Sequence, residues 1–291
     1  MANLRVIRKR IGSVKSTQQI TKAMKMVSAA KLRRSQESIN AARPYALKLR
    51  ELVESLAGKA GPEAHPLLAT REVKKLALLV VTSDRGLCGG FNSALLRTVQ
   101  RFLRDNAEKH EEISIYVVGR KGREFFRRRA VAITKEYVNI LGSLSYINAE
   151  TMSHDLVDAF KAGHFDEVQV VFNEFRSAIS QTPRFEKLFP VSIPEGTGPA
   201  EGEADIDYIY EPGRNEILAL LIPKYVEMQI FRSLLESVAG EHGARMSAMD
   251  SATRNAKEMI SSLTLQMNRA RQATITRELS EIVSGSESLK G

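Results

Sequence analysis

The chain has 291 residues, of which 43% are hydrophobic and 26% charged, a composition typical of a folded protein and unlike that of a disordered one. Its longest aliphatic runs, at 76–81 and 217–222, are about a third of the length that a helix needs to cross a bilayer, so we expect no transmembrane span. The basic start of the chain has no apolar stretch behind it that could act as a secretory signal, which favours an intracellular protein. The single cysteine, Cys88, excludes an internal disulfide and a metal site built from several cysteines.

The net charge of +9 is concentrated at the N-terminus. Residues 1–36 contain ten lysines and arginines and no acidic residue, so the remainder of the chain nets about −1. Such a block binds either a polyanion or an acidic protein surface, and composition alone does not separate the two. In both cases the partner carries negative charge.

A long helix is predicted for residues 3–56, because the segment contains only one proline and apolar residues recur at nearly helical spacing. We take residues 1–57 as the N-terminal helical domain, with Pro44 as the place where a bend would occur. A straight helix of this length would extend roughly 80 Å and project from a globular body. Its apolar positions are Leu4, Ile7, Ile11, Val14, Ile20, Met24 and Val27.

A second long helix is predicted near the C-terminus, starting at Pro223 and ending near residue 283, within a domain of residues 212–291. Its apolar and small residues step alternately by three and four, as in a coiled-coil heptad. Neither helix buries its stripe alone, so we expect the two ends of the chain to form an antiparallel coiled coil. The seam positions are Met246, Met249, Thr253, Ala256, Ile260, Leu263, Met267, Ala270, Thr274 and Arg277.

Between the helices, residues 72–210 alternate short β-rich runs with helical segments, which predicts an α/β domain. Strands are expected at 72–84, 113–119, 132–138, 168–175, 185–193 and 206–210. Helices are expected at 92–107, capped by Asn92 or Ser93, and at 120–129 and 149–162. Residues 194–205 are expected to be a surface loop. The fold class is therefore α/β, with a Rossmann-like three-layer domain beside the terminal coiled coil.

The sequence TSDRGLCGGFN at 82–92 places glycines between a predicted strand and a predicted helix, where phosphates are often bound. The spacing fits neither the dinucleotide fingerprint nor the P-loop, so we interpret the segment as a tight structural connection with Cys88 as a small buried residue. The five histidines lie far apart in sequence and are expected at the surface. No spaced histidine pair or catalytic signature is present, so no catalytic, cofactor or metal site is predicted.

Three segments together resemble the gamma subunit of F-type ATP synthases. They are IRKRIGSVKSTQQITKAMKMVSAAKLRRSQ at 7–36, TSDRGLCGGFN at 82–92, and the segment from RMSAMDSATRNAKEM to ITRELSEIVSGS at 245–286. They occur in the order found in that family and span nearly the full chain. Plastid members of the family carry a regulatory dithiol in an inserted loop, and this chain has neither the insertion nor a second cysteine.

The resemblance implies a non-catalytic central-stalk rotor subunit, which transmits rotation driven by proton flow to the catalytic head and regulates its ATPase activity. The implied partners are the alpha and beta subunits, the epsilon subunit and the membrane c-ring, without nucleic acid. The implied location is peripheral, on the cytoplasmic side of the inner (plasma) membrane. The residues implied to contact the catalytic subunits are Arg8, Lys9, Met24, Lys25, Arg245, Arg271, Gln272, Thr276 and Glu278.

Two other classes of function remain open from the residues alone. A basic coiled-coil module that binds nucleic acid or anionic lipid would show affinity that falls steeply with salt. Base stacking is not supported, because no aromatic residue precedes Tyr45 in the basic block. A nucleotide-dependent enzyme using residues 86–90 would bind nucleotide as the isolated chain.

Overall fold

The computed structural model describes residues 4–60, 65–69, 71–191 and 213–288. They form two compact units that we treat separately: a helix-pair unit of residues 1–28 and 246–291, and a sheet unit of residues 29–245. Both long helices contribute to both units. In chain order the elements are α1 (Leu4–Ala60), β1 (Lys75–Val81), α2 (Phe91–Asp105), β2 (Glu112–Val118), α3 (Arg120–Arg127), β3 (Lys135–Tyr137), a short 3₁₀ helix (Leu141–Ser143), α4 (Tyr146–Lys161), β4 (Glu167–Phe175), β5 (Gln181–Phe189) and α5 (Arg214–Ser288).

The sheet unit contains a five-stranded sheet in the order β3-β2-β1-β4-β5. The first four strands are parallel to their neighbours, and β5 is antiparallel to β4. The middle strand β1 is buried along both faces, as expected for a parallel sheet covered by helices. The prediction of a three-layer α/β fold is confirmed, with one antiparallel edge strand added.

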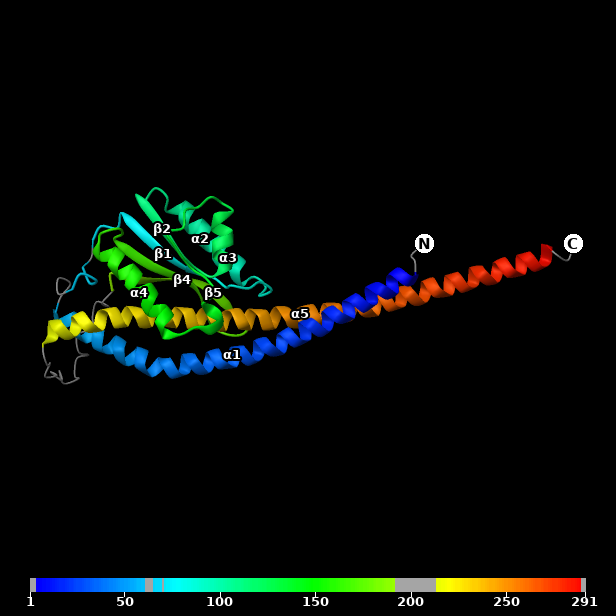
Figure 1. Cartoon of the computed structure of the whole chain (residues 1–291), viewed down its shortest axis with the longest axis horizontal. Coiled ribbons are helices and arrows are strands. Elements are labelled where there is room, and N and C mark those ends of the chain that lie inside the picture. The colour runs from blue at the N-terminus through cyan, green and yellow to red at the C-terminus, as the bar shows by residue number, and fades with distance from the viewer. Residues whose placement is uncertain (1–3, 61–64, 70, 192–212, 289–291) are drawn as a thin grey trace. The chain divides into compact units, whose positions relative to one another are not determined.

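Helices cover both faces of the sheet (Figure 1). The side chains of the strands alternate between two hydrophobic clusters on these faces. On one face, Leu79 and Val170 pack with α4 and with the parts of α1 and α5 that belong to this unit. On the other face, Leu78 and Val80 pack against α2 and α3. This arrangement follows from the two-residue period of a strand, which sends successive side chains to opposite faces.

Several predicted boundaries were wrong. The last helix starts at Arg214 and not at Pro223, which lies inside it. Leu218 and Ile222 are fully buried, so core packing holds the turn before the proline and offsets the roughly 3 kcal/mol that an interior proline costs. The strand expected at 185–193 runs from Gln181 to Phe189. The predicted loop at 194–205 and strand at 206–210 lie outside the described residues.

The start of α2 also differs from the prediction. Its N-cap is Gly90, without a side-chain cap. The Asn92 carboxamide oxygen instead accepts the Ser83 N–H at 2.9 Å, and the Ser93 hydroxyl donates to the Gly90 carbonyl. The side chain expected to cap the helix therefore holds the preceding loop.

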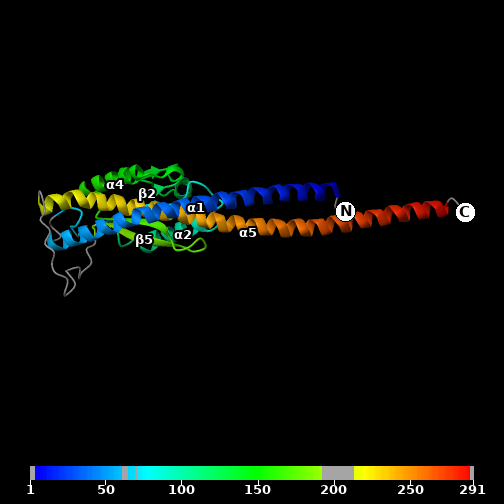
Figure 2. The ribbon, with the colours of Figure 1, turned by 90° about the horizontal axis from the view of Figure 1, so that it is seen from below.

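In the helix-pair unit, the first part of α1 and the last part of α5 lie side by side and antiparallel in both views (Figures 1 and 2). The Thr253 hydroxyl donates to Thr21 Oγ1 at 2.8 Å, and Lys25 pairs with Asp250 at 2.5 Å. With this register, residues of α5 beyond about 271 extend past the described start of α1. The predicted antiparallel pairing of the two chain ends is confirmed.

Candidate functional site

The predicted α5 seam faces α1 over the positions from Met246 to Ala270. All ten seam positions except Arg277 are buried or half-buried, and Met249, Ala256 and Leu263 are the most enclosed. The three-four spacing therefore identified the contact face of α5 correctly.

The predicted α1 stripe was partly wrong. Ile20 and Val27 are 60% and 57% exposed, whereas Thr21 and Ser28 are buried in their place. Residues 20, 24 and 27 also have helical spacing. Spacing alone therefore predicted burial of Ile20 and Val27, one residue before the side chains that are buried. As a result, the seam contains hydroxyl groups, and the exposed side of α1 carries aliphatic side chains.

The predicted contact residues of the helix-pair unit fall into two groups. Arg8 and Lys9, and four residues of α5 listed below, are exposed. Met24 and Lys25 are half-buried. The methionine that is exposed on this helix is Met26, at 60%. The four exposed α5 residues are Arg271, Gln272, Thr276 and Glu278.

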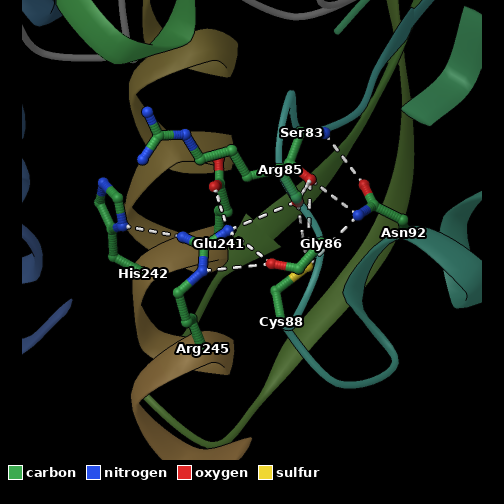
Figure 3. A network of polar contacts seen from close by, with 8 residues as sticks. All are labelled: Ser83, Arg85, Gly86, Cys88, Asn92, Glu241, His242 and Arg245. Carbon is green, nitrogen blue, oxygen red and sulfur yellow. Dashed lines mark hydrogen bonds and ion pairs between the residues drawn. The ribbon is translucent and has the colours of Figure 1, made fainter. Parts of the chain in front are cut away.

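The ninth predicted contact residue, Arg245, is buried in the sheet unit and is 7% exposed. Its guanidinium forms an ion pair with Glu241 at 2.6 Å, one turn earlier on α5 (Figure 3). It also donates to the carbonyl oxygens of Arg85 and Gly86 at 3.4 and 3.2 Å. One side chain thus fastens the glycine-rich loop to α5 across 159 positions of sequence.

The glycine-rich loop is closed on itself by a second set of contacts. The Asn92 amide nitrogen donates to Ser83 Oγ at 2.7 Å and approaches Cys88 Sγ at 3.3 Å. Leu87 and Gly89 adopt left-handed backbone conformations, with φ values of 63° and 57°. We call residues 83–92 together with Glu241, His242 and Arg245 the loop–helix clasp.

The polarity of the clasp argues against phosphate binding by this loop. A phosphate site presents N–H donors, whereas the carbonyl oxygens of Arg85 and Gly86 point to a guanidinium (Figure 3). The interpretation of the segment as a structural connection agrees with these contacts. Cys88 is 2% exposed, as expected for a small buried residue.

Two glycines let the sheet unit approach α5 closely beside the clasp. A Cβ on Gly240 would lie 3.1 Å from the Phe91 ring, and one on Gly243 would lie 3.1 Å from Ala178 Cα. Larger residues at these positions would push the β4–β5 hairpin or the start of α2 away from the helix. The clasp and these contacts hold the same two turns of α5.

Burial dominates the electrostatics of the clasp. It raises the pKa of Glu241, although the Arg245 guanidinium opposes that shift. Burial, with Arg245 and Lys31 nearby, lowers the pKa of His242 to about 4. Burial also raises the pKa of the Cys88 thiol, so the sulfur stays protonated and poorly nucleophilic near neutral pH.

Three of the five histidines depart from the predicted surface location; one of them, His110, is half-buried with its Nδ1 3.2 Å from the Val73 carbonyl oxygen. His65 is buried, and its Nδ1 accepts the Leu67 N–H at 3.2 Å. His242 is half-buried beside Arg245, with 3.4 Å between their ring and guanidinium nitrogens. Sequence reasoning missed these three because their burial results from the packing of the folded chain, which no local motif indicates.

Among the described residues, no helix has the length and apolarity needed to cross a membrane.

Comparisons with known proteins agree along the whole chain. The family model described as ATP synthase matches residues 3–289. The chain is 55% identical over 291 residues to the ATP synthase gamma chain of Geobacter metallireducens, and 53% identical to that of Trichlorobacter lovleyi, with full coverage of both proteins.

Solved structures are similar as well. The central stalk and c-ring structure of Tetrahymena thermophila mitochondrial ATP synthase contains a chain with a TM-score of 0.61 and 25% identity, with 80% of this chain and 99% of that chain covered. A rotor chain of the Euglena gracilis mitochondrial ATP synthase has a TM-score of 0.67 at 18% identity, covering 94% of this chain and 98% of that one, and supports the fold. The chain described here belongs to the ATP synthase gamma-chain family.

Proposed function

We propose that this chain is the central-stalk rotor of an F-type ATP synthase. It is a non-catalytic subunit: it transmits rotation driven by proton flow to alpha and beta subunits, where ADP and phosphate become ATP, and it regulates their ATPase activity. The observation that carries the proposal is the antiparallel helix pair with its exposed α5 extension, in a chain 53% and 55% identical over its full length to two bacterial gamma chains.

The surface of the helix-pair unit supports insertion into a protein sleeve. Large aliphatic side chains are exposed along the last part of α5, including Leu265, Leu279 and Ile282 at 58%, 57% and 68%. On α1, Val6 and Ile20 are exposed beside the basic residues of the first turns. A mixed apolar and basic helix surface of this kind is typical of a protein-binding site and atypical of a free solvated helix.

The coupling mechanism follows from the asymmetry of the helix pair. A shaft biases a catalytic subunit only as far as it binds one conformation of that subunit better than another. Arg271 and Gln272 are exposed on α5, where a guanidinium fork and an amide can bind a carboxylate in one rotary position and release it in the next. We propose the same kind of exchange for Arg8, Lys9, Thr276 and Glu278.

Some of the predicted contacts need a different role in this proposal. The Lys25 ammonium is already paired with Asp250, and Arg245 is committed to the loop–helix clasp. We propose that these two residues set the shape of the shaft, and that Met24 contributes to the seam. Residues 1–57 and 212–291 then act as the shaft and residues 72–210 as the body.

The remaining partners and the location belong to the same proposal. An epsilon subunit and a c-ring would bind the chain, which would sit peripherally on the cytoplasmic side of the inner (plasma) membrane. The gamma-chain family is part of a membrane-associated complex, which is consistent with this location.

Reconstitution tests the proposal. Alpha and beta subunits of a close relative are mixed with the wild-type chain or with Arg271→Ala plus Gln272→Ala, and ATP hydrolysis is measured. We expect a stable three-component complex, and turnover that falls roughly fivefold or more in the double variant. The exposed pair Glu108→Ala plus Lys109→Ala serves as the control and should leave turnover unchanged. Failure of the wild-type chain to assemble would contradict the proposal.

A further inference from the structure

Three metal-ligating side chains converge between α4 and α5 in the sheet unit. Glu150 and His154 lie one turn apart on α4, and Glu227 lies on α5. Their ligand atoms are all within 4.8 Å of one another. A search for histidine pairs in the sequence does not reveal this set, because it combines one imidazole with two carboxylates from two helices.

Glu227 is the least expected member of this set. It is 2% exposed, although it adjoins hydrophobic residues of the main core. A buried carboxylate is costly unless a cation or several donors compensate its charge. Neither the seam nor the clasp uses it, so the function proposed above leaves it unexplained.

A hydrogen bond fixes the Glu227 carboxylate in place. The Tyr146 hydroxyl donates to Glu227 Oε2 at 2.6 Å, and the Tyr146 ring packs edge-on against Phe231 with 5.6 Å between centroids. Carboxylates that ligate metals are commonly held in this way by an outer partner. The second oxygen, Glu227 Oε1, accepts from the Lys224 ammonium at 3.3 Å.

The structure shows that a cation is already favoured at this point. The Lys224 ammonium lies 2.9 Å from Glu227 and 3.6 Å from Glu150. Two carboxylates and one ammonium leave a net charge of −1, so the local charge is incompletely neutralised. The Lys224 side chain is 46% exposed and can turn toward solvent without leaving a buried ammonium.

We propose that Glu150, His154 and Glu227 bind a divalent transition metal ion of the zinc class, which displaces the Lys224 ammonium. Imidazole nitrogen with carboxylate oxygen suits this class better than Mg²⁺ or Ca²⁺, which prefer oxygen ligands. Metal–ligand distances of about 2.0–2.2 Å require ligand atoms that now lie up to 4.8 Å apart to move closer together, and the exposed His154 side chain has room to turn toward the two carboxylates. His154 is on the open side, so water completes the coordination.

The ion would link α4 to α5 within the sheet unit. This inference goes beyond the rotor function and does not depend on it, since binding is measured on the full chain without alpha or beta subunits. A failed reconstitution would leave the metal result standing, and a failed metal titration would leave the rotor proposal standing.

The test is calorimetric titration of the full chain with Zn²⁺ near neutral pH, with Co²⁺ absorption as a second probe. We expect one ion per chain, and an affinity that falls about tenfold or more in Glu150→Gln and in His154→Ala. The control is His164→Ala, an exposed histidine that follows α4, and it should bind as the wild type does. Circular dichroism verifies that each variant is folded.

Lys224→Met separates a metal site from a purely structural ion pair. If the ammonium competes with the metal, its removal should raise Zn²⁺ affinity by about tenfold. No saturable binding by the wild type, binding that His154→Ala leaves unchanged, or weaker binding in Lys224→Met would each overturn the proposal.

Discussion

Arg245 joins two distant parts of the chain through a single guanidinium. It neutralises Glu241, which is 6% exposed, and it holds two loop carbonyl oxygens. Because Met246 follows directly in sequence, the clasp fixes α5 at the last turn of the sheet unit. We infer that a substitution at Arg245 acts first on the fold of this unit.

Arg245→Ala should lower the free energy of unfolding by about 3 kcal/mol, because it leaves the Glu241 carboxylate buried without its cation. Arg245→Ala combined with Glu241→Ala removes both charges and should recover part of that loss. Urea unfolding measures both values. A double variant that is less stable than Arg245→Ala would show that the buried charge is not the cause.

The rate of Cys88 alkylation reports on the loop–helix clasp, because Cys88 is the only thiol in the chain. Its sulfur is buried within the closed loop, so alkylation requires the loop to open. Arg245→Ala should raise the rate of iodoacetamide modification about tenfold or more, because about 1.4 kcal/mol of lost loop stability corresponds to a factor of ten. An unchanged rate would mean that Arg245 does not hold the loop.

His242 makes the stability of the sheet unit depend on pH. Its folded-state pKa of about 4 lies below its ordinary value of 6.5, so the unfolded chain takes up the proton first as the pH falls. The wild type should therefore lose stability relative to His242→Gln between about pH 6.5 and 4, by up to roughly 3 kcal/mol. Urea unfolding across this range measures the difference. Parallel pH profiles for the two proteins would contradict a buried neutral imidazole.

At the scale of the elements, the α1–α5 seam is weakened by hydroxyl groups. Thr21 and Thr253 meet inside it, and each also lies within hydrogen-bonding distance of a carbonyl of its own helix. The hydrogen bond between the two hydroxyls therefore adds little stability, because each hydroxyl already has a carbonyl partner in its own helix. A seam of this kind can slip or open more readily than one built from leucine and isoleucine.

Thr21→Val together with Thr253→Val should stabilise the helix pair by about 1 kcal/mol, because valine keeps the branched shape and buries a methyl group in place of each hydroxyl. Thermal unfolding followed by circular dichroism measures the change. Thr17→Val, at an exposed position of α1, is the matched control and should have little effect. A clear loss of stability in the double variant would show that the hydroxyl contact is required.

Helices and strands could be predicted where a local sequence pattern marks them. They were harder to predict where their packing partners are distant in sequence. Heptad spacing identified the α5 seam, and β1 followed from its apolar run. The start of α5 was wrongly predicted at Pro223. Burial of Leu218 and Ile222 outweighs the low helix propensity of proline, so the helix begins before it. The role of Arg245 could not be read from spacing, since its loop partners lie 159 and 160 positions away.

At the scale of the whole molecule, family membership and architecture came from motifs spread over the full chain. The contact residues proposed on α1 and α5 came from the resemblance, and they stay predictions until a complex is assembled. The exposed aliphatic side chains on the last part of α5 support a protein partner there. They also predict that the isolated chain associates with itself at high concentration.

As the proposed rotor, this chain turns within the ring of alpha and beta subunits. The most direct measurement fixes the ring to a surface and follows a probe on Glu108→Cys, an exposed position in the sheet unit, while the native Cys88 stays buried. The probe should rotate in one direction during ATP hydrolysis and stop when ATP is removed. Sustained hydrolysis by the assembled complex with a stationary probe would contradict it.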